Sequence, residues 1–353
     1  MGRHAPAEIL AIGMVTPVGL STAQTAASVR TGIGRLGESE LSDNAGDALV
    51  MGLADDEQVP PLAEALEDRP FTIRQERMLR LGGTALDEAL AAVDEGPPPA
   101  LHLGLAEPRA EERSRIDDEL LDLLPIQAGR KLDRARSKTY PLGRAAGLVA
   151  LDQALTMLDS GEAKTVLVGA VDSYWDDGLL SALGREGRLK AGEVTDGFVP
   201  GEGAAFLLLG PVRARHGAGN ACIVATGRGH EAGHLYSETP YLGEGLAGAV
   251  RDLFQATPPD LLRRPLECVY AGLNGESHWA KGWGVSHIRN ARFFAEALRM
   301  EHPADCMGDP GAALGPIMLG LAADRQVRGL DQTPALVWCA SDRGESAAAL
   351  VTR

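Results

Sequence analysis

Residues 137–175 read SKTYPLGRAAGLVALDQALTMLDSGEAKTVLVGAVDSYW, and this stretch decides the fold. Gly143 permits a tight turn, and apolar residues then recur at helical spacing across residues 145–158. Gly161 follows, as a glycine commonly does where a helix ends. Residues 165–171 are apolar and rich in β-branched side chains, which is typical of a strand buried on both faces. The stretch therefore predicts a short strand, a sharp turn, a buried helix and a buried strand.

Arg144 stands at the start of the predicted helix. The first turn of a helix carries unpaired backbone N–H groups and the positive end of the helix dipole. Many enzymes place a nucleophile there because this field stabilises a thiolate or an alkoxide. A guanidinium at the same place is electrostatically unfavourable unless an acidic side chain compensates it. The sequence therefore predicts an acidic partner for Arg144.

Outside this stretch, strands and helices alternate along the chain. Further strands are predicted over residues 7–15, 101–105, 221–226, 266–271, 334–339 and 347–351. Residues 196–209 are predicted to form a glycine-rich turn that runs into a strong strand. Further helices are predicted over residues 22–30, 74–93, 116–127, 246–254, 285–299 and 311–323, with loop-like or irregular chain over 37–70 and 176–190. Such alternation predicts an α/β fold with a largely parallel sheet. A polar connection over residues 210–220 divides the chain into two predicted halves, 1–212 and 213–353.

The composition limits the classes of partner. A net charge of −15 argues against nucleic acid and against an anionic membrane surface. The sequence has no apolar run of membrane-spanning length and no apolar leader at its start. The four cysteines are scattered without a CxxC pair, which favours buried single thiols in a reduced, cytoplasmic setting.

Several motifs together resemble the β-ketoacyl–acyl carrier protein synthases. Residues 13–19 (GMVTPVG), followed by a helix and Gly32-Ile33, resemble the opening of that family. Residues 196–204 (DGFVPGEGA) match its glycine-rich signature, and residues 161–170 match the step from helix to strand after its nucleophile. Residues 227–245 resemble the start of its second half. The resemblance implies a thiolase-like fold with two related βα halves, a five-layer αβαβα core and usually a dimer.

The catalytic positions that the resemblance implies do not carry the family's catalytic residues. The family's cysteine falls on Arg144, and its two histidines fall on Gly272 and Asp309. A guanidinium stays protonated and cannot accept an acyl group as a nucleophile. Independently of alignment, no cysteine precedes Cys222. The resemblance therefore implies a chain that cannot run the family's condensation.

Two interpretations of Arg144 remain open. In the first, it forms a structural ion pair with Asp309 or Glu276, which lie on the loops that surround the nucleophile in the family. In the second, Arg144, Asn274, Glu276 and Asp309 line a remodelled pocket and bind an anionic ligand such as a phosphate or carboxylate.

Other candidates for chemistry carry weaker signals. Glu276 with His278 is a possible acid–base pair on the same loop. Cys268 and Cys306 lie on segments that converge near the site in the family, so a relocated thiol nucleophile is conceivable, although buried structural cysteines are commoner.

Residues 230–234 (HEAGH) match the HExxH pattern of zinc proteases. That pattern binds zinc only on a helix, and here it follows a strand that ends in glycines, so we expect no metal site. Gly227 and Gly229 lack the third glycine of a dinucleotide-binding turn, and no cofactor is expected.

The sequence thus predicts a dimeric scaffold, accessory protein or partner subunit that does not condense acyl chains. The dimer is either a homodimer or a heterodimer with a related ketosynthase, and an acyl carrier protein is a possible further partner. The alternative is an acyltransferase that acts on acyl thioesters with a displaced catalytic set.

Overall fold

One mixed sheet runs through the part of the chain that the computed structural model describes, residues 4–91, 96–114, 116–212 and 219–353. Its ten strands lie in the order β10-β9-β11-β12-β8-β1-β7-β6-β4-β5. They are β1 (Ala7–Val15), β4 (Ala100–Leu105), β5 (Lys138–Pro141), β6 (Val166–Ser173), β7 (Glu202–Pro211), β8 (Cys222–His230), β9 (Leu266–Ala271), β10 (Phe294–Glu301), β11 (Ala335–Ala340) and β12 (Glu345–Thr352).

The sheet has two five-stranded parts that meet at a narrow junction. Strands β1 and β4 to β7 form one part, and β8 to β12 form the other. Between the two parts, β1 and β8 share only the register pairs Ala7–Ile223 and Glu8–Cys222. Residue 213, where the second predicted half begins, lies outside the described residues.

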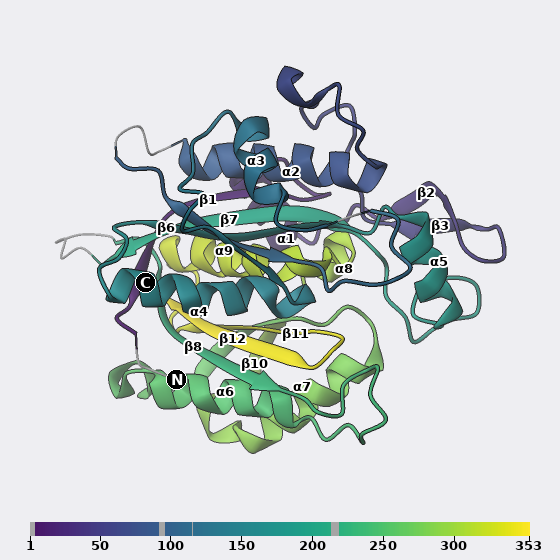
Figure 1. The fold of residues 1–353 in the computed structure, drawn as a ribbon. Coiled ribbons are helices and arrows are strands. Elements are labelled where there is room, and N and C mark those ends of the chain that lie inside the picture. The colour runs from purple at the N-terminus through teal and green to yellow at the C-terminus, as the bar shows by residue number, and fades with distance from the viewer. Residues whose placement is uncertain (1–3, 92–95, 115, 213–218) are drawn as a thin grey trace.

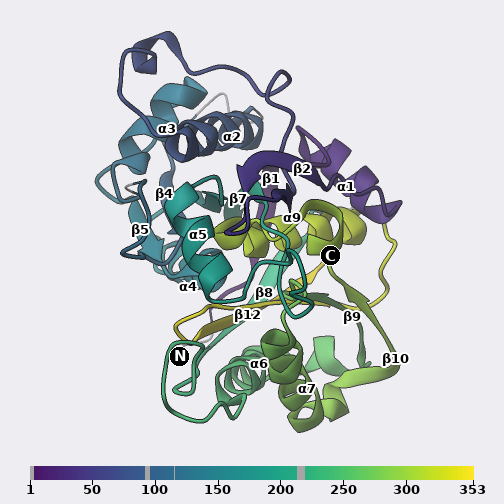
Figure 2. The same cartoon turned by 90° about the vertical axis from the view of Figure 1, so that its right-hand side faces the viewer.

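Helices cover both faces of each part and give five layers (Figure 1). The helices are α1 (Thr22–Arg30), α2 (Ile73–Leu90), α3 (Leu120–Ala128), α4 (Ala146–Asp159), α5 (Asp177–Arg185), α6 (Glu244–Ala256), α7 (Ser277–Arg289), α8 (Ala304–Met307) and α9 (Leu314–Val327). Helices α2 and α3 cover the outer face of the first part, and α6 and α7 cover the outer face of the second. Helices α4 and α9 lie between the two parts, as the turned view also shows (Figure 2). The thiolase-like fold predicted from the sequence is confirmed.

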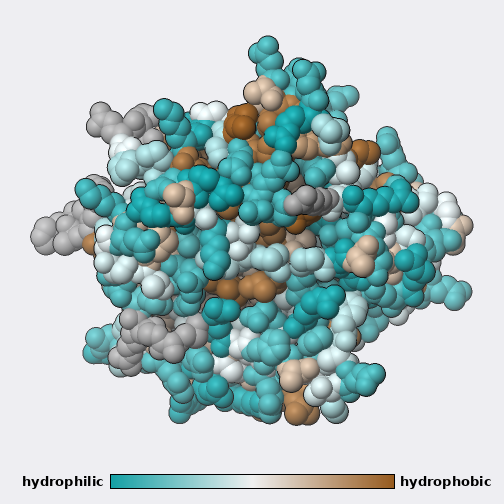
Figure 3. Space-filling view, viewed as in Figure 1, coloured by the Kyte–Doolittle hydropathy of each residue, from teal (hydrophilic) through white to brown (hydrophobic). Residues whose placement is uncertain are grey.

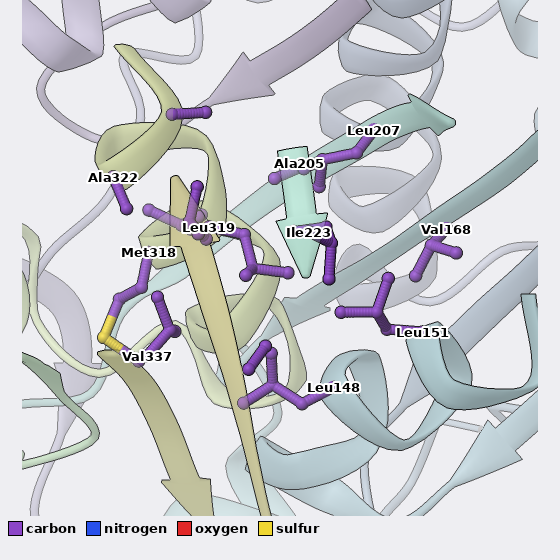
Figure 4. Packing of buried hydrophobic residues seen from close by; sticks show 14 of the residues in the cluster. Leu148, Leu151, Val168, Ala205, Leu207, Ile223, Met318, Leu319, Ala322 and Val337 are labelled. Atoms are coloured by element: carbon purple, nitrogen blue, oxygen red, sulfur yellow. The ribbon is translucent and has the colours of Figure 1, made fainter. Parts of the chain in front are cut away.

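The middle layer is the apolar centre of the molecule (Figure 4). Leu148 and Leu151 of α4 pack in one buried cluster with Met318 and Leu319 of α9 and with strand residues from both parts of the sheet. A Cβ atom on Gly147 would lie 2.4 Å from the Pro316 ring, so the two helices approach too closely there for a larger residue. Residues 146–152 at the start of α4 are all buried, so neighbouring elements surround this end of the helix.

The central stretch folds as predicted. Strand β5 is followed by Gly143, whose φ of +65° makes the sharp turn, and then by α4. Gly161, with a φ of +74°, ends the helical region before the fully buried strand β6. The predicted helix over residues 74–93 is α2, which ends at Leu90; Val93 lies outside the described residues.

Three predicted segments are wrong. The helix predicted over residues 285–299 is instead the second half of α7 followed by strand β10, which pairs with β9 in parallel. The acidic segment 37–70 contains a hairpin of β2 (Gly37–Ser42) and β3 (Ala48–Met51), and the segment 176–190 contains α5. Helix α5 and the hairpin pack together in a small apolar cluster of their own.

The face drawn in Figure 3 is mainly hydrophilic, with small, separated hydrophobic areas. Among the described residues, no helix combines the length and the apolar character that crossing a membrane requires.

Candidate functional site

The start of α4 is held by the turn between β11 and β12. The Ala145 N–H donates to the Ser341 hydroxyl oxygen at 2.8 Å, and that hydroxyl donates to the Leu142 carbonyl at 2.5 Å. Ser341 therefore takes up one of the N–H groups that a helix start leaves unpaired. It also fixes the backbone on both sides of Arg144, which sets the direction of the arginine side chain.

The Arg144 side chain is buried, with 4% of its surface exposed, and all its nitrogens have acceptors. Its Nη1 lies 2.9 Å from Asp309 Oδ2, its Nη2 lies 2.7 Å from Asp342 Oδ1, and its Nε donates to the Ala340 carbonyl at 3.3 Å. The guanidinium also lies over the Trp279 ring, 4.1 Å from the centroid. The predicted acidic partner is confirmed as Asp309, and a second carboxylate from Asp342 completes the compensation.

The loop between β9 and α7 adds Asn274 and Glu276 to this cluster. The Asn274 side-chain amide donates to Asp309 Oδ2 at 2.8 Å and to Glu276 Oε2 at 3.1 Å. Glu276 Oε2 lies 3.8 Å from Arg144 Nη1. The second oxygen of Asp309 accepts the Gly311 N–H at 2.9 Å, so the carboxylate is fully used inside the protein.

Arg188 is the second cation of the cluster. Its Nε and Nη2 donate to the two oxygens of Glu276 at 2.7 and 3.0 Å, a bidentate geometry. Its Nη1 also lies 2.6 Å from Asp342 Oδ2, so Asp342 bridges the two arginines. The Trp279 indole N–H donates to Glu276 at 2.8 Å. The buried cluster thus joins two guanidiniums and three carboxylates through direct contacts.

The charges in this cluster shift the pKa of its members in predictable directions. Burial alone would lower the pKa of Arg144, but Asp309 and Asp342 outweigh burial and raise it. Burial would raise the pKa of Asp342 and Glu276, but the two arginines outweigh it and lower both. Asp309 differs, because burial outweighs its partners and raises its pKa. The two arginines, Asp342 and Glu276 are held in their charged forms.

Glu107 lies beside this cluster without an ion pair of its own among the described residues. Its carboxyl accepts the Arg343 N–H at 3.1 Å. Burial first, and the nearby Asp342 charge second, raise the pKa of Glu107 to about 7. Glu107 is therefore a group at this site that changes charge near neutral pH.

The cavity in front of Arg144 is small. Its volume is about 50 Å³, and its walls include Glu107, Tyr174, Ala312 and Asp342. Small-molecule sites commonly measure about 300–1,000 Å³. The space therefore holds a few water molecules and not an acyl chain, because the ion-paired side chains occupy the room around the start of α4.

The structure brings together the four residues that the sequence predicted as a ligand site: Arg144, Asn274, Glu276 and Asp309. Their polar groups bond to one another, which favours the structural ion pair, and ligand binding by this set stays a prediction. Gly272 has no room for a side chain, because a Cβ atom there would lie 2.8 Å from the Trp338 carbonyl oxygen and 3.1 Å from Cys339 Cα.

Among the residues that the structure describes, no hydrogen bond or ion pair joins the candidates for a displaced catalytic set. Glu276 is bound by Arg188, and His278 lies against the Tyr241 ring with a centroid distance of 4.2 Å. Cys268 lies on β9, where burial raises the pKa of its thiol to about 11, and burial also raises the pKa of Cys306 in α8. High thiol pKa values disfavour the thiolate that a nucleophile needs. The cysteine beside Arg144 is instead Cys339, which is fully buried.

Residues 230–234, which match the HExxH pattern, lie at the end of β8 and in the turn that follows it. His230 is the last residue of β8, and the chain then turns, so the two histidines do not share a helical face. The Glu231 carboxylate accepts backbone N–H groups from Gly233 at 3.3 Å and from Gly245 at 3.0 Å. Among the residues that the structure describes, no group of His, Cys, Asp and Glu is arranged to hold a metal ion.

Sequence reasoning missed Arg188, Asp342, Trp279, Ser341 and Glu107. Asp342 and Ser341 stand in the turn between β11 and β12, where no local pattern marked them. Arg188 lies just after α5, in the segment wrongly expected to be irregular, and no local pattern marked it.

Comparison with known proteins agrees with this fold. Residues 143–214 match the model of the family described as beta-ketoacyl synthase, N-terminal domain. No curated protein matches the chain in a direct sequence comparison.

Solved ketosynthases superpose over nearly the whole chain. A ketosynthase in complex with its chain length factor from Xenorhabdus doucetiae matches with a TM-score of 0.75 and 14% identity, covering 100% of both chains. The ishigamide ketosynthase/chain length factor matches with a TM-score of 0.74 and 14% identity, covering 99% of each. A ketosynthase from module 6 of the bacillaene synthase of Bacillus subtilis 168 matches with a TM-score of 0.77 and 14% identity, covering 98% of this chain and 72% of that one. The resemblance stated from the sequence is confirmed, by fold over the whole chain and by sequence over residues 143–214.

Proposed function

We propose that this chain, which has the ketosynthase fold and matches the β-ketoacyl synthase N-terminal domain over residues 143–214, is a non-condensing relative that works as a subunit of a dimer. Its contribution is a protein surface and a rigid, ion-paired core in place of an acyl-accepting site. The observation that carries the proposal is the buried contact of Arg144 with Asp309 and Asp342.

The chemical reason is the state of the residue at the helix start. The resemblance puts the family's nucleophile at Arg144, and a guanidinium remains protonated and fully hydrogen-bonded there. A cavity of about 50 Å³ leaves no space for the thioester that would have to reach it. Condensation would require the ion-paired side chains to leave their partners, which is costly for buried charges.

Complexes between two different chains have a precedent among the similar structures. Two of them are described as a ketosynthase with a chain length factor, and another as an acyl carrier protein in complex with its ketosynthase. Strand β5 lies at one edge of the sheet, and its outer side has no neighbour among the described strands. An unpaired edge of this kind can add a strand from a second chain. We therefore favour a dimer, either of two copies or with a related ketosynthase.

The alternative is an acyltransferase with a displaced catalytic set. Glu107 gives it some support, because a carboxyl with a pKa of about 7 beside a cavity is suited to proton transfer. None of the lining residues is a cysteine, serine or threonine, so the cavity does not offer a thiol or an aliphatic hydroxyl to accept an acyl group.

The two candidates are separated by intact-protein mass after incubation with acyl and malonyl thioesters, with an active ketosynthase as the positive control. We expect no adduct, no thioester consumption, and a dimer mass by light scattering. A stoichiometric adduct on Cys268, Cys306 or any other residue would contradict the proposal and establish an acyltransferase. A monomer mass both alone and after co-expression with a related ketosynthase would contradict the subunit role.

A further inference from the structure

A second cavity lies on the outer layer of the second half, away from Arg144. It is formed where the last turns of α6 face the junction between α7 and β10, and its volume is about 510 Å³. We call it the arginine groove, defined by its lining residues Ala247, Arg251, Phe254, Gln255, Arg289, Asn290, Arg292 and Phe293. Its size falls within the range of about 300–1,000 Å³ that is usual for small-molecule sites.

The charge of the arginine groove opposes that of the molecule. Its lining contains three arginines and no carboxylate, in a chain whose net charge is −15. The cavity beside Arg144 is different, because its lining mixes three arginines with four carboxylates. The lining of the arginine groove thus carries positive charge, and no carboxylate in the lining neutralises it.

The three guanidiniums of the groove are weakly engaged. Arg292 has no ion pair among the described residues and lies over the Phe293 ring, 4.6 Å from its centroid. Arg251 lies 3.3 Å from the carboxylate of the adjacent Asp252, and Arg289 lies 3.9 Å from Glu244. Elsewhere on the surface, arginines such as Arg130 and Arg328 have carboxylate partners within 2.8 Å. The three guanidiniums of the groove therefore keep N–H donors available for a ligand.

Compensation of helix dipoles does not account for all three cations. Arginine in the last turn of a helix is favourable near the negative end of the dipole, and Arg289 fits that role in α7. The end of α7 is already capped by Asn290, whose backbone N–H and side-chain amide both donate to the Ser286 carbonyl, at 3.1 and 3.0 Å. Arg251 precedes the last turn of α6 and Arg292 lies beyond α7. Neither side chain is therefore placed to compensate the dipole at the end of its helix.

We propose that the arginine groove binds a small phosphorylated ligand of nucleotide size. Guanidiniums offer paired N–H donors that match phosphate oxygens, and three of them around one hollow suit a ligand with more than one phosphate. Phe254 and Phe293 stack with centroids 4.0 Å apart, and together they form an apolar part of the lining for the remainder of the ligand. Because the arginine groove is a cavity of limited size, it fits a small molecule better than an acidic protein segment, which needs an extended surface.

The test is isothermal titration of the whole protein with magnesium-free ATP and inorganic pyrophosphate at low ionic strength. We expect saturable binding of one equivalent that weakens as salt rises, and no binding of adenosine, because the phosphates supply the contacts. R289E and R292E should each lower the affinity by about tenfold or more, since a charge-assisted contact becomes a repulsion. The matched control is R263E, which changes an exposed arginine outside the groove that pairs with Asp260. Melting temperatures identify any variant that fails to fold. If R289E or R292E fails to fold, the affinity of the other is compared with that of R263E.

Three results would overturn the proposal. The first is the absence of saturable binding for both phosphate probes. The second is an equal loss of affinity in R263E, which would mean a general charge effect. The third is tighter binding of a polyglutamate peptide than of either probe, which would assign the groove to an acidic protein partner.

Discussion

Arg144 Nη1 lies 2.9 Å from Asp309 Oδ2, although 165 positions separate the two residues in the chain. Both side chains are almost completely buried. The contact joins the start of α4 to the loop before α9, so it ties together the two helices of the middle layer at one end. Breaking it would leave a buried charge without compensation, which is costly.

Arg144→Ala should lower the free energy of unfolding by about 3–5 kcal/mol, the usual cost of removing one partner of a buried ion pair. Adding Asp309→Asn to this variant should recover part of the loss, because the uncompensated carboxylate is then gone. Urea denaturation followed by circular dichroism measures both changes.

The matched control is Arg264→Ala, which removes an exposed pair with Glu267 and should change stability by at most about 0.5 kcal/mol. Equal stability of Arg144→Ala and the unsubstituted protein would instead favour the interpretation in which Arg144 is kept for a ligand.

Glu107 should give stability a pH dependence near neutrality. Its pKa is raised from 4.5 to about 7, so the folded state binds this proton more tightly than the unfolded state does. Its contribution is therefore complete at or below pH 4.5 and is lost as pH rises through about 7. Melting temperatures of the unsubstituted protein and Glu107→Gln across that range should differ in slope, with the flatter curve for Glu107→Gln. Parallel curves would show that Glu107 does not titrate there.

Gly272→Ala should destabilise the protein by about 1–3 kcal/mol, because the new methyl group meets backbone atoms of Trp338 and Cys339. Gly284→Ala is the matched control. Gly284 lies inside α7 with nothing within 4 Å of its added Cβ, so alanine there should stabilise by about 0.5–1 kcal/mol. Thermal unfolding of the two variants should therefore shift in opposite directions.

Glu231→Ala should lower stability by about 1–3 kcal/mol, because backbone N–H groups of Gly233 and Gly245 lose their acceptor. Treatment with EDTA should leave the melting temperature of the unsubstituted protein unchanged. His230→Ala should have little effect, since its side chain is 57% exposed. A fall in melting temperature with EDTA, matched by His230→Ala, would reveal a zinc site instead.

The sequence predicted the parts of the fold that local pattern determines. The apolar period of α4, the glycines around it and the buried run of β6 indicated the central unit, and the helix dipole argued for an acid beside Arg144. Strand β10 was mistaken for helix because Ala295, Glu296, Leu298 and Arg299 are good helix formers. Pairing with β9 overrides that preference, and α7 ends at Arg289 with Asn290 as its C-cap.

The candidate site was predicted only where a family motif marked it. Asp309 and Glu276 were expected near Arg144 because their loops surround the site in similar proteins. Arg188 reaches the cluster across 88 positions from Glu276, and Asp342 reaches Arg188 across 154. Such contacts form only when folding brings distant segments together, so no short pattern in the sequence indicates them.

The cap that Ser341 provides to α4 also bears on the order in which the chain folds. Ser341 and Ala145 are 196 positions apart, so this end of the helix stays uncapped until the hairpin of β11 and β12 has formed and docked. Contacts that close such long loops generally form after the local ones. We therefore expect Arg144 to lack its carboxylate partners in the folding transition state. Replacing Arg144 or Ser341 should therefore accelerate unfolding while leaving the rate of folding almost unchanged.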